Sequence, residues 1–171
     1  MIERRVFGVD LASASWSDNG SAVLTFTVGG QTWNGIKIPA LAWPDSQLTP
    51  AGMAKAIDDF ALANGVAAVA LDGPQGWRDP ETPEGTPGVG RRCEWRCHTQ
   101  GKTGIAGKTY PQTQCGWVTF CIDVFEELLS LGHTQLGDAA GTLSPMAGRY
   151  WLLECFPTWT WKESGLERRT G

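Results

Sequence analysis

Basic charge, histidine and long apolar runs are all scarce in this sequence. The chain has two histidines in 171 residues and a formal net charge of −4. A strongly basic footprint for nucleic acid is therefore missing. A nuclease is still compatible with this charge, because bound Mg²⁺ can neutralise phosphate and carboxylate together. No apolar run reaches membrane-spanning length, and residues 1–5 do not resemble a signal peptide. We therefore expect a cytoplasmic protein without a membrane partner.

Cysteine is present in an odd number, five, which favours reduced, free thiols. The closest group is Cys93, Cys97 and His98. Its C-x₃-C-H spacing is not a strong zinc pattern, and no second closely spaced pair accompanies it. Neither histidine lies in a segment that would position it as the base of a Cys-His hydrolase.

Tryptophan is unusually frequent, with nine residues in this length. Core packing is the simpler explanation for each one singly. Exposed tryptophans also serve as anchors at interfaces. They could dock a protein partner or a second copy of the chain.

The first part of the sequence predicts three antiparallel strands. Residues 6–12, 22–28 and 31–38 are rich in β-branched and apolar side chains. Turn signals separate them at residues 18–20 and 29–30. A three-stranded meander follows from this pattern.

Two helices and two further strands are predicted after the meander. Thr49 and Pro50 give an N-cap and a first helical residue, and Gly65 stands where a helix ends. Apolar residues recur at helical spacing between these points, with Asp58 and Asp59 on the opposite face. Strands are expected at residues 66–71 and 150–156, a second helix from residue 118 to 132, and a last short helix from 157 to 164. Residues 133–148 are expected to form a loop.

This order of elements predicts one α/β domain spanning residues 1–171. A right-handed crossover places the fourth strand beside the first and parallel to it. The expected result is a mixed five-stranded sheet ordered 3-2-1-4-5, with strand 2 antiparallel and helices flanking it. That is a ribonuclease H-like architecture. Residues 78–114 are expected to form a long irregular loop, which in a compact domain is usually functional or mobile.

Three acids are expected at the carboxyl ends of the three parallel strands. They are Asp10, Asp72 and Glu154. A carboxylate in an apolar strand is costly to bury unless it is paired or binds a metal. Asp72, which precedes a Gly-Pro pair, also fits a turn, and Glu154 also fits an arginine pair. Hard oxygen ligands suit Mg²⁺ or Mn²⁺, so we expect a divalent-metal site formed by these three residues.

Four short motifs strengthen this expectation through a family resemblance. The segments V-F-G-V-D-L-A, V-A-L-D-G-P-Q-G-W, R-R-C-E-W-R and L-L-E-C-F-P-T-W-T-W span residues 6–161. In order and spacing they resemble the landmarks of the domain-of-unknown-function 429 family, predicted nucleases of the ribonuclease H-like superfamily. The resemblance implies site roles for Asp10, Asp72 and Glu154, with Arg92, Glu94 and Arg96 beside them. Members of that family continue to another helix with a late acid, and here Glu94 is the expected fourth metal ligand.

The leading functional hypothesis is a divalent-metal-dependent nuclease or phosphodiesterase. Its substrate would be a nucleic acid or another phosphoester. Asp10, Asp72 and Glu154 would hold the metal, and Arg92, Arg96 or Lys108 would stabilise developing charge. The alternative is a non-catalytic ribonuclease H-like binding or assembly module, which the acidic balance and the tryptophans favour. Nucleotide phosphate transfer of the actin-like kind ranks last, because that duplicated fold needs a longer chain.

Overall fold

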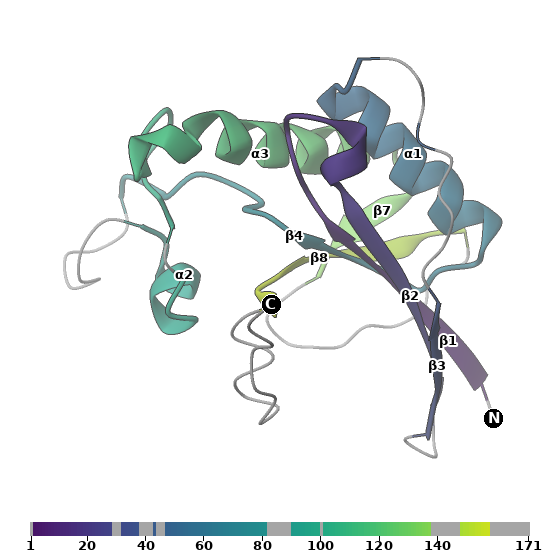
Figure 1. The fold of residues 1–171 in the computed structure, drawn as a ribbon. Coiled ribbons are helices and arrows are strands. Elements are labelled where there is room, and N and C mark those ends of the chain that lie inside the picture. Colours follow the sequence, from purple (N-terminus) through teal and green to yellow (C-terminus); the bar gives the residue numbers. More distant parts are fainter. Residues whose placement is uncertain are drawn as a thin grey trace.

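A computed structural model describes residues 2–28, 32–37, 43, 47–81, 90–99, 101–137 and 148–157 (Figure 1). Its strands are β1 (Ile2–Asp10), β2 (Gly20–Val28), β3 (Thr32–Lys37), β4 (Ala68–Asp72), β5 (Lys102–Thr103), β6 (Thr109–Tyr110), β7 (Thr134–Leu136) and β8 (Tyr150–Cys155). Its helices are α1 (Pro50–Ala63), α2 (Arg92–Arg96) and α3 (Cys115–Ser130), with short 3-10 turns at Trp16–Asp18 and Gln112–Gln114. Beyond Pro157, the predicted last helix lies outside the described residues.

The central sheet is mixed, and its described strands follow the order β3-β2-β1-β4-β8-β7. Strand β2 is antiparallel to β1 and β3, while β1–β4, β4–β8 and β8–β7 are parallel pairs. The predicted order of five strands is therefore confirmed. The strand count was wrong, because the sheet has a sixth strand, β7, in the segment expected to be a loop. Three residues are too few for alternation between apolar and polar side chains to be recognised.

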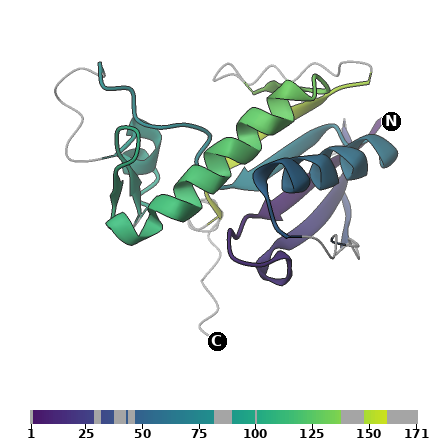
Figure 2. The same ribbon diagram turned by 90° about the horizontal axis from the view of Figure 1, so that it is seen from above.

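Helices α1 and α3 lie side by side over one face of the sheet (Figure 2). The start of α1 is as predicted: Thr49 accepts a hydrogen bond from the Gly52 amide at 3.1 Å, and Pro50 is the first helical residue. Gly65 follows the helix with φ = 58°, a left-handed conformation that glycine adopts without strain. The core between helices and sheet is built from apolar side chains of every layer, including Phe7, Val9, Met53, Ile57, Val69, Leu71, Phe125 and Leu152. No helix in the described ranges combines the length and apolarity needed to cross a bilayer.

Asp58 lies inside this core rather than on the outer face of α1. Its exposed fraction is 4%. One oxygen accepts a hydrogen bond from the Tyr150 hydroxyl at 2.9 Å, and the other lies 3.0 Å from His133 Nδ1. The expectation failed because Asp58 sits one turn after Ala54 in the buried stripe of α1. Asp59, by contrast, is exposed, as the sequence indicated, and it pairs with Lys55.

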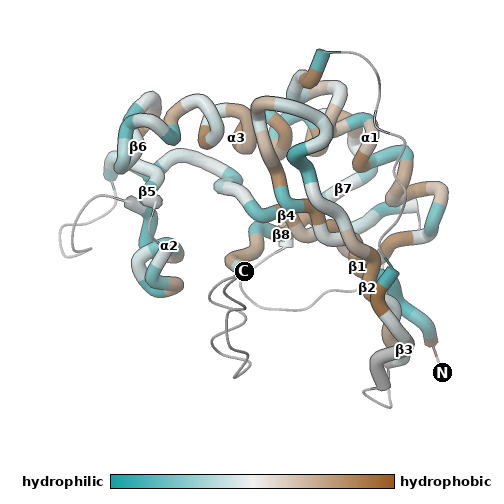
Figure 3. The backbone as a smooth tube through the Cα atoms, in the orientation of Figure 1, coloured by the Kyte–Doolittle hydropathy of each residue, from teal (hydrophilic) through white to brown (hydrophobic). Residues whose placement is uncertain are grey.

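The predicted irregular segment contains short elements that extend away from the sheet. Helix α2 and the β5–β6 hairpin lie beyond the N-terminal end of α3 in Figure 1. Figure 3 shows this part mostly in pale and hydrophilic colours, in contrast to the apolar strands of the sheet. A main-chain hydrogen bond from Arg78 N to Gly104 O, 2.9 Å long, joins the start of this segment to the β5–β6 hairpin. Polar contacts therefore help to hold the described part of this segment in place. We call the segment the insertion (residues 78–114).

Candidate functional site

Asp10 and Asp72 are the last residues of two neighbouring parallel strands. They are register partners in the β1–β4 pair. Register partners in parallel strands direct their side chains to the same face of a sheet. The expectation that these two acids become neighbours at one rim of the sheet is therefore supported by the backbone itself.

Glu154 reaches the same rim from a different register position. In the β4–β8 pair, Asp72 is opposite Cys155, and Glu154 is opposite Leu71. Strand alternation thus directs the Glu154 side chain to the face opposite that of Asp72. Two of the three predicted acids share a face, and the third lies at the edge beside them.

The Asp72 carboxyl lies in an unfavourable electrostatic environment. Among the described residues, it has neither a hydrogen-bond nor an ion-pair partner. Burial, followed by the charges of Asp10 and Glu154, raises the pKa of Asp72 from 3.8 to about 6. A cation at this rim would relieve the repulsion among the three acids.

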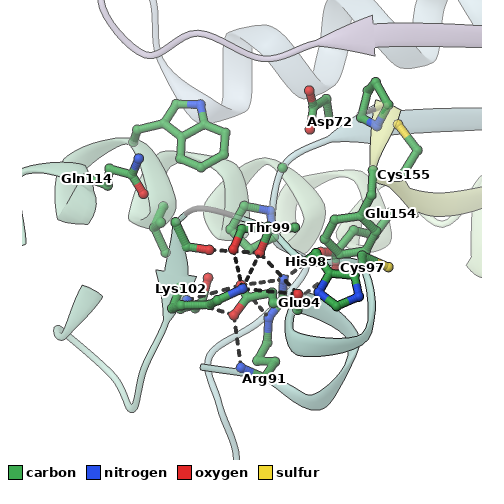
Figure 4. Close-up of a pocket in the computed structure, with 18 residues that line it drawn as sticks. Asp72, Arg91, Glu94, Cys97, His98, Thr99, Lys102, Gln114, Glu154 and Cys155 are labelled. Carbon is green, nitrogen blue, oxygen red and sulfur yellow. Dashed lines mark hydrogen bonds and ion pairs between the residues drawn. The ribbon is translucent and has the colours of Figure 1, made fainter. Parts of the chain in front are cut away.

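Arg91 neutralises Glu154. The guanidinium donates from Nη1 to Glu154 Oε2 at 2.7 Å and from Nη2 to Oε1 at 2.5 Å (Figure 4). Glu154 Oε2 also accepts a hydrogen bond from the Gln75 amide at 3.1 Å. A two-point arginine–carboxylate contact of this kind is strong and directional. It fastens the insertion to the end of β8.

Glu94 is the second carboxylate that Arg91 holds. Its exposed fraction is 4%, and its oxygens accept bonds from Arg91 Nε at 3.1 Å, the Arg91 amide at 2.9 Å and the Thr103 amide at 2.9 Å. These donors occupy both oxygens. The predicted role of Glu94 as a fourth metal ligand stays a prediction, and metal binding there would require these bonds to break.

The arginine that lies at the site is not one of the two that were predicted there. Arg92 and Arg96 are exposed, and neither lines the cavity described below. Their role as charge stabilisers stays a prediction. Arg91, one residue earlier, is the arginine that lies at the site, because it occupies the N-cap position and turns back toward Glu94 at N3. The alternative interpretation of Glu154, that it pairs with an arginine, agrees with this contact, although the sequence did not indicate which arginine.

A cavity of about 310 Å³ lies beside the acids. The ends of β4 and β8 form one side, and the insertion and the first turn of α3 form the other (Figure 4). Asp72, Glu154, Gln114 and Trp117 are among the residues that line it. The cavity opens next to the rim where the sequence predicts chemistry.

The donor set at this rim fits a divalent cation of the magnesium type. In the described ranges, no three or more His, Cys, Asp or Glu side chains cluster closely enough to hold an ion by themselves. Mg²⁺ keeps several waters and is usually bound by one or two carboxylates together with substrate phosphate, so a complete protein cage is not needed. Asp10 and Asp72, which share one face, would supply two hard oxygen ligands.

Comparisons with protein-family models, curated proteins and solved structures find no match to this chain.

Proposed function

We propose that this protein is a divalent-metal-dependent nuclease or phosphodiesterase with a ribonuclease H-like fold. The observation that carries the proposal is the register of Asp10 with Asp72 at the ends of two parallel strands. Ligands of open α/β sheets bind outside the carboxyl ends of the strands. Two adjacent carboxylates there favour the binding of a cation, because their negative charges repel each other.

The fold assignment has two supports. The strand order β3-β2-β1-β4-β8, with β2 antiparallel, is the order expected for a ribonuclease H-like sheet. The four motifs that resemble the domain-of-unknown-function 429 family occur on β1, β4, α2 and β8. Three of them end at the rim, and the fourth contacts it through Arg91, which is where a common site would require them.

The chain's own residues would divide the work at this site. Asp10 and Asp72 would hold Mg²⁺ or Mn²⁺, which supplies Lewis-acid chemistry for phosphodiester hydrolysis. Arg91 keeps Glu154 and Glu94 in place. Arg92 and Arg96, exposed on α2, would attract the phosphate backbone of a nucleic acid.

Cleavage assays test the proposal directly. Single- and double-stranded DNA, RNA, an RNA–DNA hybrid and a small phosphodiester are incubated with Mg²⁺, Mn²⁺ or chelator. We expect metal-dependent cleavage that falls at least about hundredfold in Asp10→Asn and Asp72→Asn. Asp59→Asn, a change in an exposed acid on α1, is the matched control and should keep full activity. Equal rates for wild type and Asp10→Asn on every substrate would reject the proposal.

A non-catalytic binding or assembly module is the second candidate. The observation that favours it is that Arg91 already pairs with two of the four predicted metal ligands, Glu154 and Glu94. Calorimetry with Mn²⁺ separates the two candidates. Micromolar binding that is lost in Asp72→Asn supports a metal site, and the absence of binding by wild type supports the module.

A further inference from the structure

The cavity beside the acids has the size of a small-ligand site. Its volume of about 310 Å³ lies at the lower end of the range of roughly 300–1,000 Å³ that such sites occupy. Aromatic, amide and charged side chains share its lining. A flat group the size of a nucleobase is an appropriate occupant on volume alone.

The charges of the lining argue against an anionic occupant. Among the described residues of the lining, Arg91 and Lys102 carry the full positive charges. Arg91 is committed to Glu94 and Glu154. Lys102 Nζ donates to Thr99 Oγ1 at 3.0 Å, to Glu94 O at 3.1 Å and to Thr99 O. A phosphate in this cavity would face carboxylates without an uncommitted cation, so a neutral group fits better.

Trp117 provides a fixed aromatic side to the cavity. Its indole Nε1 donates a hydrogen bond of 2.7 Å to the carbonyl of Leu11, the residue after Asp10. The bond joins α3 to the end of β1 and restricts rotation of the ring. A ring held in this way can act as a stacking platform that loses little entropy when a base binds.

Gln114 supplies the matching polar group. Its side-chain amide has no hydrogen-bond partner within the described part of the chain, although it lines the cavity (Figure 4). Gly101 makes room for it, since a Cβ at that position would lie 2.2 Å from Gln114 Oε1. A free amide offers one acceptor and two donors. Glutamine uses this combination to bind the edge of a base with two hydrogen bonds.

We propose that this cavity binds one unpaired base of a nucleotide or nucleic acid, stacked on Trp117 and hydrogen-bonded by Gln114. The proposal rests on the proposed function for its choice of a nucleotide ligand. The base would lie beside Asp72, and its phosphate would lie outside the cavity toward Asp10. A base held in this way cannot stay in a duplex. Single-stranded or extrahelical nucleotides are therefore the expected substrate class.

Nuclear magnetic resonance with uncharged nucleosides tests the base pocket without any metal. The indole N–H signal of Trp117 is identified from the spectrum of Trp117→Phe, and the protein is titrated in chelator with adenosine, cytidine and uridine. Ribose 5-phosphate and inorganic phosphate are the comparison probes. We expect at least one nucleoside to shift the Trp117 signal, and neither comparison probe to do so.

Two variants sharpen the measurement. Gln114→Ala removes an amide without a partner, so it should fold normally and weaken nucleoside binding about tenfold. Gln135→Ala, an exposed glutamine on β7, is the matched control and should bind like wild type. If no nucleoside shifts the signal, if phosphate shifts it equally, or if Gln114→Ala binds nucleoside as wild type does, the base pocket is wrong.

The pocket and the nuclease proposal can fail separately. Asp10→Asn should keep nucleoside binding while it loses Mn²⁺ binding. Nucleoside binding without cleavage of any substrate would keep the pocket and reject the nuclease. Metal-dependent cleavage without nucleoside binding would keep the nuclease and reject the pocket.

Discussion

Asp58 is buried and Asp72 is half-buried, but their carboxyl groups have opposite surroundings. Each oxygen of Asp58 has a partner, Tyr150 on one side and His133 on the other. Asp72 has no partner among the described residues and lies near two further acids. Burial alone therefore does not mark a functional acid. The supply of donors around it separates a structural carboxylate from one arranged to receive a cation.

Glu154 and Glu94 form an intermediate case. They too are withdrawn from solvent, but one guanidinium serves both. The contrast between carboxylates with hydrogen-bond or ion-pair partners and a carboxylate without them can be tested by substitutions at or next to these residues.

The largest effect is expected when Arg91 is removed. Arg91→Met leaves Glu94 and Glu154 without their cation, and breaking a buried pair from one side costs about 3–5 kcal/mol. Urea denaturation should show this loss in the free energy of unfolding. Arg92→Met, an exposed neighbour, should change it by no more than about 0.5 kcal/mol. Equal stability of the two variants would mean that the Arg91 pairs do not hold the insertion.

Replacement of Asp58, whose two oxygens both have partners, should also destabilise the fold. Asp58→Ala leaves the buried Tyr150 hydroxyl without an acceptor and should lower the free energy of unfolding by about 2–4 kcal/mol. Asp59→Ala, its exposed neighbour, is the control and should have little effect. Adding Tyr150→Phe to Asp58→Ala should restore part of the loss, since the unsatisfied hydroxyl is then gone. A loss that grows instead would contradict this account of the cluster.

A divalent cation should stabilise the protein through Asp72 and not through Asp58. At a hundredfold excess over its dissociation constant, Mn²⁺ should add about 2.7 kcal/mol to the free energy of unfolding. Thermal unfolding with and without Mn²⁺ measures this increment. Asp72→Asn should abolish it, and Asp58→Asn should keep it on a lower baseline. The same increment in both variants would place the cation elsewhere.

The smallest effect is expected from Asp72→Asn in the absence of metal. Because folding raises the pKa of Asp72 from 3.8 to about 6, the folded state binds the proton more tightly than the unfolded state. Wild-type stability should therefore fall as pH rises from about 4 to 6, and Asp72→Asn should escape this loss. At pH 7 the variant should be more stable by about 1–2 kcal/mol, a value reduced for partial solvent exposure. A difference that persists at pH 4 would argue for another cause.

The sequence predicted those features that depend on nearby residues. The cap at Thr49, the end of α1 at Gly65 and the strand that ends on Asp72 all follow from local patterns. Contacts between distant segments were not predictable in the same way. Arg91 and Glu154 are 63 residues apart, and Trp117 and Leu11 are 106 apart. Asp58 falls in the buried stripe of α1, but the Tyr150 hydroxyl that satisfies it there comes from 92 residues further along the chain.

The contact of Arg91 with Glu154 has a consequence for engineering this protein. The insertion and the sheet contribute opposite sides of one cavity, and a single side chain makes ion pairs on both. A chimera in which another loop replaces the insertion would have to restore a cation at the same point. Without that cation, the chimera would have a new cavity wall but would leave the negative charge of Glu154 on the sheet uncompensated.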